Sequence, residues 1–277
     1  MKLSQIVLIA GATLFVIVLF SMPKVIVDNK KGSMLNEMGT QPLAENIKIP
    51  DVSKIHKSEI PEKAKEKLNF LTNSYKEVSN NKKKIIFADS LVALYRTYYQ
   101  YDSAAKYAEE ISLIEPNLKN WEKTGDVFSE AANFSAGNKK EFYADKARAY
   151  YKFCLDKNPS HTDVKVKLAL TYIGGKNTME GVVLLREVVE KDPNNEKALF
   201  NLGFLSLQMG WQDKAVARFE QLIKVNPRHE MAHFYLGALY KEAGEIEKAK
   251  KHFQHALSIS TDPDMKKVIN EYLEELK

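Results

Sequence analysis

Apolar side chains recur at helical spacing along most of the chain that follows residue 60. Between residues 61 and 80 they succeed one another at steps of four, three, four and three: Ala64, Leu68, Leu71, Tyr75 and Val78. Such steps place side chains on one face of an α-helix. Pro61 suits the first turn, where its missing N–H is not needed. The pattern therefore predicts a leading helix over 61–80.

From residue 85 onward the same kinds of residue return every 34 positions. The sets that share this interval are Leu168, Leu202 and Leu236; Gly203 and Gly237; Ala215 and Ala249; Phe219 and Phe253; and Pro159, Pro193 and Pro227. Each unit divides into two amphipathic helices; in 196–229, Gly210 ends the first and Asn226-Pro227 stops the second. Fixed periods of this length are typical of repeat arrays. The sequence predicts units at about 85–117, 118–161, 162–195, 196–229 and 230–263.

The second unit holds about ten extra residues around Asn133 to Glu141. We place them in longer helices or in a longer turn. After the last unit, residues 264–277 carry a further apolar face, formed by Met265, Val268, Ile269, Tyr272, Leu273 and Leu276. This segment predicts a capping helix that covers the end of the array.

These positions resemble the tetratricopeptide repeat, with a small residue where two helices cross, an aromatic residue or leucine in the second helix and a closing proline. The resemblance is strongest over 162–263 and weaker over 85–161. The unit from 162 departs from it, with Ala169 in place of glycine and Gly181 in place of alanine. The resemblance implies an all-α fold, an α-solenoid of about five helix hairpins with a concave groove, and protein–protein binding in general.

The amino-terminal part of the chain has a different pattern. Residues 6–22 contain no charged side chain, and this length suits a membrane-spanning helix. A cleaved signal peptide fits less well, because no small-x-small site follows Phe20. We expect a short tail (1–5), a transmembrane anchor (6–22) and an extended tether (23–60). Counting lysines on each side favours a cytoplasmic bulk domain, but a short basic amino end is typical of a signal anchor. The non-cytoplasmic side is weakly favoured.

Positions 5, 9 and 12 of each first helix line the groove in the repeat family. In the last three units eight of these nine positions are apolar: Val166, Leu170, Ile173, Phe200, Phe204, Leu207, Phe234 and Ala238. In the two earlier units they are mostly polar, with acidic Asp89, Glu122 and Asp126. We expect an unidentified protein partner to bury a peptide or helix on the apolar part, while the acids select a basic end. Two alternatives stay open: successive helices cover these residues, or the tether does.

Composition excludes several other classes of function. The 41 Lys and Arg against 36 Asp and Glu leave a net charge of +5, but basic residues are not concentrated: the longest basic run is Lys82-Lys83-Lys84, and the others, such as Lys30-Lys31, are pairs. We therefore expect no nucleic-acid partner. The one cysteine, Cys154, excludes an internal disulfide framework and falls at a buried position of the repeat. No glycine-rich phosphate loop or nucleophile elbow is present, so we expect neither a cofactor nor an enzyme.

One motif of zinc proteases does occur, because His229-Glu230-Met231-Ala232-His233 has the form H-E-x-x-H. The repeat register argues against a zinc site, since His229 falls in a turn, whereas His233 falls on the face of the first helix that packs against the second. His252 and His255, three residues apart in the next helix, could add only a weak metal site. A zinc hydrolase is a remote alternative. Self-association of the chain into a homo-oligomer is the nearer alternative to partner binding.

Overall fold

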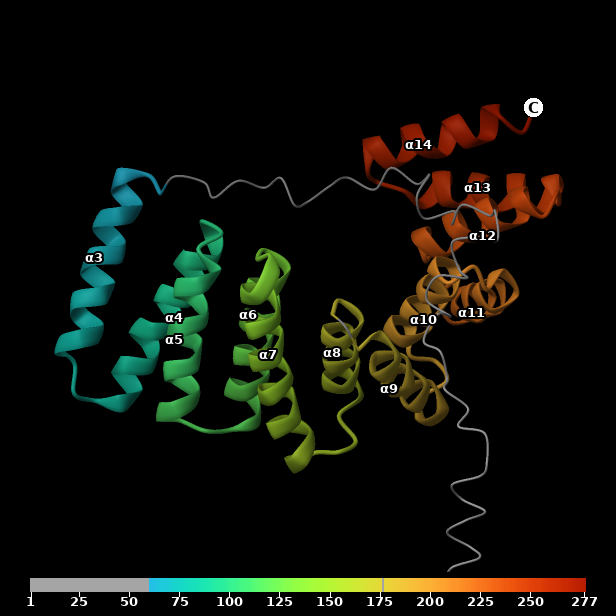
Figure 1. The fold of residues 1–277 in the computed structure, drawn as a ribbon. Coiled ribbons are helices and arrows are strands. Elements are labelled where there is room, and N and C mark those ends of the chain that lie inside the picture. Colours follow the sequence, from blue (N-terminus) through green and yellow to red (C-terminus); the bar gives the residue numbers. More distant parts are fainter. Residues whose placement is uncertain (1–59, 176) are drawn as a thin grey trace, which may run out of the picture. The chain divides into compact units, whose positions relative to one another are not determined.

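The computed structural model describes residues 60–175 and 177–277, and this part of the chain contains twelve helices and no strand (Figure 1). The helices are α3 (Glu62–Glu77), α4 (Asn81–Thr97), α5 (Tyr101–Ile114), α6 (Leu118–Asn133), α7 (Gly137–Lys157), α8 (Thr162–Ile173), α9 (Thr178–Lys191), α10 (Glu196–Gln208), α11 (Gln212–Val225), α12 (Glu230–Glu242), α13 (Ile246–Ile259) and α14 (Pro263–Glu274). The predicted tail, membrane anchor and tether lie outside the described residues. No helix within 60–277, apart from residue 176, is long and apolar enough to cross a bilayer.

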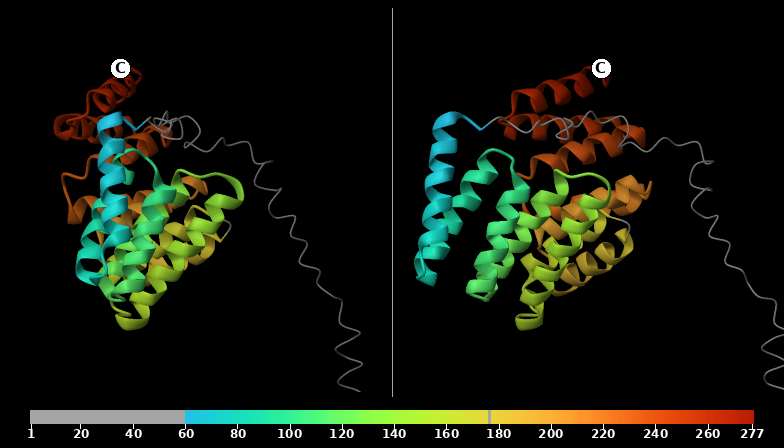
Figure 2. Two further views of the ribbon diagram at one scale, coloured as in Figure 1. Left: turned by 90° about the vertical axis from the view of Figure 1, so that its left-hand side faces the viewer. Right: turned by 60° about the vertical axis from the view of Figure 1, so that its left-hand side comes forward.

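Ten of these helices form five hairpins that stack in chain order (Figure 2). We call the first helix of each hairpin the A helix and the second the B helix; the A helices are α4, α6, α8, α10 and α12. Each B helix also packs against the A helix of the next hairpin. The expected all-α solenoid is therefore confirmed for the described residues. α3 packs on the first hairpin, and α14 packs on α13 at the other end.

The extra residues of the second hairpin lengthen its helices. α6 has 16 residues and α7 has 21, compared with 13 in α10 and 14 in α11. The turn between α6 and α7 holds only residues 134–136, so the insertion does not form a loop.

Small residues let the two helices of a hairpin approach closely. A Cβ atom added to Gly203 on α10 would lie 2.8 Å from the ring of Phe219, which is completely buried on α11. In the hairpin α8–α9 the two small residues are exchanged. Ala169 on α8 stands at the position of Gly203, and Gly181 on α9 stands at the position of Ala215. Leu185 on α9 is the equivalent of Phe219. The departure from the repeat pattern at 169 and 181 is therefore a compensated exchange.

The apolar core forms two clusters. One is built from α3 to α8 and the other from α8 to α14, where Ile269 and Leu276 of the last segment are buried. Tyr272 of α14 stacks on Phe253 with ring centroids 5.1 Å apart. α14 thus covers apolar side chains that the last hairpin cannot bury by itself.

Candidate functional site

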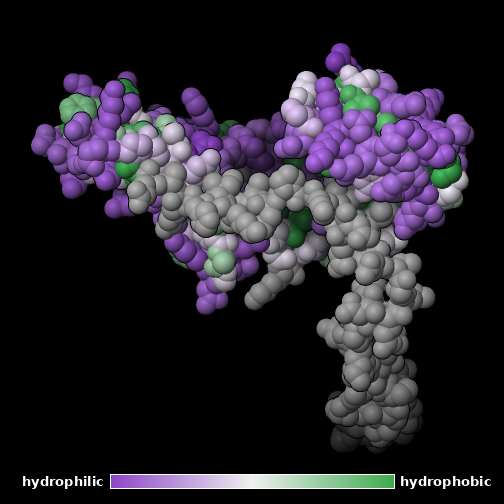
Figure 3. Space-filling model, turned by 90° about the horizontal axis from the view of Figure 1, so that it is seen from above, coloured by the Kyte–Doolittle hydropathy of each residue, from purple (hydrophilic) through white to green (hydrophobic). Residues whose placement is uncertain are grey.

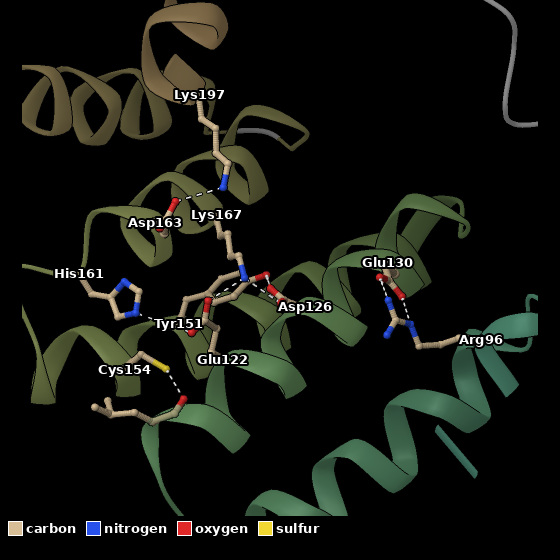
Figure 4. A network of polar contacts seen from close by, with 11 residues as sticks. Arg96, Glu122, Asp126, Glu130, Tyr151, Cys154, His161, Asp163, Lys167 and Lys197 are labelled. Atoms are coloured by element: carbon tan, nitrogen blue, oxygen red, sulfur yellow. Dashed lines mark hydrogen bonds and ion pairs between the residues drawn. The ribbon is translucent and has the colours of Figure 1, made fainter. Parts of the chain in front are cut away.

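A hollow of about 470 Å³ lies among the A helices of the first three hairpins. All but one of its lining residues belong to α4, α6 and α8; they are Arg96, Lys119, Glu122, Lys123, Asp126, Ser129, Glu130, Lys167 and Leu170, with Tyr151 from α7. We call this cavity the A-helix hollow. Figure 4 shows the polar contacts that surround it. Its position coincides with the polar part of the predicted groove, since both Glu122 and Asp126 line it.

Lys167 joins α8 to α6 at the hollow. Its Nζ lies 2.8 Å from a carboxylate oxygen of Glu122 and 2.8 Å from one of Asp126 (Figure 4). Burial disfavours the charged form of Lys167, but the hydrogen bonds to the two carboxylates outweigh it and raise the pKa of the ammonium group. The lysine therefore stays protonated, and the two acids are already paired.

Ion pairs between residues 34 positions apart connect successive A helices. Arg96 donates from Nε to Glu130 at 2.7 Å and from Nη2 to the other carboxylate oxygen at 2.5 Å. Lys123 donates to Asp89 at 2.6 Å, and further along the stack Lys197 donates to Asp163 at 3.1 Å. The repeat period places these side chains side by side, because equivalent positions of neighbouring hairpins face each other. Opposite charges 34 residues apart are a signal in the sequence that could have predicted these pairs.

The acidic residues that we expected to select a basic partner are thus neutralised within the chain. Asp89, Glu122 and Asp126 each bind a lysine of the next A helix. Lys119 lines the hollow and has no ion-pair partner among the described residues. The lining then carries four basic and three acidic side chains, so the hollow presents both signs of charge.

Tyr151 fills the space beneath α6. Its hydroxyl donates to Asp126 at 2.9 Å, and its ring occupies the place where a side chain at Gly125 would lie. Cys154, one turn further along α7, is buried and donates to the carbonyl oxygen of Leu118 at 3.5 Å. Burial raises the pKa of the Cys154 thiol to about 11, which makes it a poor nucleophile.

The apolar part of the predicted groove is less accessible than its sequence suggests. Four of its eight side chains are buried between helices: Val166, Leu207, Phe234 and Ala238. Phe204 is partly buried and packs on Tyr235 of the next A helix, with ring centroids 5.7 Å apart. Ile173 and Phe200 are partly buried as well, whereas Leu170 exposes 39% of its surface. Half of the eight positions are thus buried, and Phe234, for example, packs on Phe253 of α13 and on Tyr272 of α14.

The accessible apolar positions are therefore few, and Leu170 stands out among them because it lines the hollow. On the face shown in Figure 3, hydrophobic residues occur as scattered spots within a mainly hydrophilic surface. An occupant of the A-helix hollow would meet charged groups first and Leu170 as its main apolar contact.

The histidines of the H-E-x-x-H motif lie in different environments. His229 precedes α12 and accepts a hydrogen bond from the backbone N–H of Ala232, so it caps the helix. His233 turns instead toward α13, with its Nδ1 3.0 Å from Nδ1 of His252. Nε2 of His233 and Nε2 of His255 each donate to the carbonyl oxygen of Pro227 at 3.0 Å. No group of three or more metal-ligating residues was found in the part of the chain that the structure describes.

Comparison with family models gives three matches, each described as a tetratricopeptide repeat, over residues 163–195, 184–217 and 231–263. The chain contains tetratricopeptide repeats. These matches span residues 163–217 and 231–263, within the hairpins from α8 to α13, where the 34-residue period is clearest. A comparison with curated proteins found no match.

Several solved structures are similar in fold. A crystal structure of MamA protein is 18% identical and covers 63% of this chain and 91% of its own, with a TM-score of 0.48. A structure of MamA from residue 41 to the end, from Desulfovibrio magneticus RS-1, is 15% identical. The match covers 72% of this chain and 96% of that one, with a TM-score of 0.47. YrrB, described as a tetratricopeptide repeat protein with an unusual peptide-binding site, is 17% identical. The match covers 73% of this chain and 97% of that one, with a TM-score of 0.45.

Proposed function

We propose that this protein is a non-enzymatic scaffold that binds a segment of a partner protein at the A-helix hollow. The observation that carries the proposal is the hollow itself, which brings side chains of three successive A helices around one space. Repeats of this kind stack into extended surfaces that serve binding. The occupant must therefore be long enough to contact more than one hairpin.

The chemistry of the lining indicates how such a segment would bind. The A helices are held in place by ion pairs, so the hollow needs little rearrangement to accept a ligand. Lys119 offers an unpaired charge to a carboxylate, and the exposed part of Leu170 offers apolar surface. The other charges are already paired within the chain, so they have little binding energy left to offer. We propose that they orient the segment and that burial of Leu170 supplies the affinity.

The experiment compares capture by three forms of the full-length protein: wild type, Leu170→Asp and Leu113→Asp. Leu113 on α5 exposes 71% of its surface and lies outside the hollow, so it is the matched control. Leu170→Asp adds a fourth acid to a lining that already holds Glu122, Asp126 and Glu130, and it removes the apolar contact. We expect partner capture to fall at least about tenfold for Leu170→Asp, as for an interface hot spot, and to stay unchanged for Leu113→Asp.

Both variants change exposed residues and should keep the helical circular-dichroism signal. Equal capture by Leu170→Asp and wild type would exclude the A-helix hollow as the binding site. The remaining alternative is self-association of the chain. Sedimentation of the wild-type protein at micromolar concentration distinguishes it from partner binding, because a self-associating protein would form oligomers without a partner.

We further propose that residues 6–22 tether the repeats to a membrane, with the repeats on the non-cytoplasmic side. The support is the uncharged stretch in the sequence. Alkaline extraction of cell membranes should leave the full-length protein in the pellet and release a form that lacks 6–22. A reporter fused to the carboxyl end would determine the side, and release of both forms by alkali would contradict the anchor.

A further inference from the structure

A second cavity, of about 330 Å³, lies between the B helices α9 and α11 over the A helix α10. Its lining is Val182, Arg186, Leu202, Leu205, Ser206, Met209, Trp211, Lys214, Ala217 and Arg218. We call it the basic pocket. It shares no lining residue with the A-helix hollow.

The basic pocket differs from the hollow in the sign of its charges. Three of its ten lining residues are cationic, namely Arg186, Lys214 and Arg218, and none is acidic. The structure gives none of the three an ion pair with a described residue, whereas most cations around the hollow are paired. Three cations around one small cavity repel one another and favour an anionic occupant.

Two of the cations are held in defined positions. Arg218 donates from Nη1 to Oε1 of Gln221 at 3.2 Å, and the amide nitrogen of Gln221 donates to the carbonyl oxygen of Pro193 at 2.9 Å. Lys214 lies over the ring of Trp211, with its Nζ 4.2 Å from the centroid. Gln221 and Trp211 thus fix the cations without neutralising them.

Apart from Ser206, the rest of the lining is apolar. Val182, Leu202 and Leu205 are buried, and Trp211 exposes 40% of its surface beside them. Ser206, the one neutral polar side chain, already donates its hydroxyl to the carbonyl oxygen of Leu202 at 2.8 Å. An occupant therefore has to combine carboxylates for the rim with an apolar side chain for the floor.

We propose that the basic pocket binds an acidic peptide segment of a protein partner, with one apolar side chain inserted between α9 and α11 and flanking carboxylates on Arg186, Lys214 and Arg218. The cavity volume admits a single large side chain rather than the face of a folded domain. Arginine forms strong, directional hydrogen bonds with carboxylates, which gives such a contact specificity. This site is additional to the A-helix hollow and does not depend on it.

The test uses the full-length protein and the fluorescein-labelled peptide Gly-Asp-Glu-Leu-Asp-Glu. A second readout is the fluorescence of Trp211 with the unlabelled peptide, in a Trp121→Phe background that leaves Trp211 as the only tryptophan. We expect saturable binding that weakens with salt, and a change in Trp211 emission. A peptide with lysine at every acidic position should show at least about tenfold weaker binding, since three cations face it.

The variants Arg186→Gln and Arg218→Gln, combined, should weaken binding at least about tenfold, because each loses a charge-assisted hydrogen bond. Arg228→Gln is the matched control, since Arg228 is exposed, lies outside the pocket and has no described ion pair. Leu113→Asp, which changes a residue outside both cavities, should bind the peptide like wild type. The A-helix hollow is tested separately by partner capture with Leu170→Asp, so the failure of one proposal is distinguishable from the failure of the other.

Three results would overturn the proposal. One is no binding of the acidic peptide at millimolar concentration, and another is equal binding by the wild type and the double variant. The third is displacement of the peptide by inorganic phosphate at the peptide's own concentration, which would identify a simple anion site instead of a peptide site.

Discussion

Gly181 provides the sharpest stability test of how the hairpins are packed. A Cβ atom added there would lie 2.5 Å from the carbonyl oxygen of Ala169 and 2.6 Å from Cγ1 of Ile173. Ordinary contacts of a Cβ atom begin near 3.4 Å, so α9 has to move away from α8 by several tenths of an ångström. Overpacking of this kind costs about 1–3 kcal/mol. The better helix propensity of alanine offsets up to about 1 kcal/mol.

The nearest atom is a backbone oxygen, which cannot swing aside, so the cost falls in the upper part of that range, about 2–3 kcal/mol. After the offset of about 1 kcal/mol, Gly181→Ala should reduce the free energy of unfolding by about 1–2 kcal/mol. For a chain of this size that corresponds to a fall of about 2–8 °C in Tm. Circular dichroism during heating and in urea measures both quantities. Gly174→Ala is the matched control, because its Cβ would meet only the carbonyl oxygen of Leu170, at 3.6 Å. The helical backbone at Gly174 accepts alanine, so its Tm should be unchanged or slightly higher.

A second variant separates overpacking from other effects. Adding Ala169→Gly to Gly181→Ala restores the order found in the next hairpin, with glycine on the A helix and alanine on the B helix. Part of the lost stability should return, because α9 can then seat closer to α8. A stability of Gly181→Ala equal to or above that of the wild type would refute the close approach of α8 and α9.

Two further predictions concern polar groups in the core. Burial lowers the pKa of His252 to about 4 and also lowers the pKa of His233, below the value of about 6.5 expected in the unfolded chain. Unfolding therefore takes up protons below about pH 6.5. The free energy of unfolding is at its maximum above that pH and falls as the pH drops toward 4. Tm measured against pH should show this fall, and His252→Gln should make it smaller. Arg148 is almost fully buried and donates to the carbonyl oxygen of Thr171 at 3.1 Å and to Glu141 at 2.7 Å. Arg148→Met should cost about 2–3 kcal/mol in urea unfolding, and a loss below 0.5 kcal/mol would show that these bonds contribute little.

The helical architecture could be predicted because its causes are local and periodic. The 34-residue interval between Leu168, Leu202 and Leu236 fixes where hairpins recur, and the closing prolines fix where they end. The exchange of small residues between positions 169 and 181 was visible in the sequence as well. Its reason required the structure, because it depends on the distance between two helix axes.

The site was predictable only in part. A helical wheel places a side chain on one face of its own helix, but it does not show whether other helices cover that face; Phe234 and Val166 are both buried. The neutralisation of Asp89 by Lys123 depends on the same distance between hairpins. The basic pocket was missed because its three cations belong to two different helices, and only the packing of α9 against α10 and α11 brings them to one cavity.

Site-specific photo-cross-linking tests the central claim most directly. A photoreactive phenylalanine replaces Leu170 in the A-helix hollow or, as the control, Leu113 on α5, and the full-length protein is irradiated in its own cells. Binding at the hollow predicts a discrete covalent product with one partner protein from position 170 and none from position 113. Products of equal yield from both positions, or a product from position 113 alone, would contradict it.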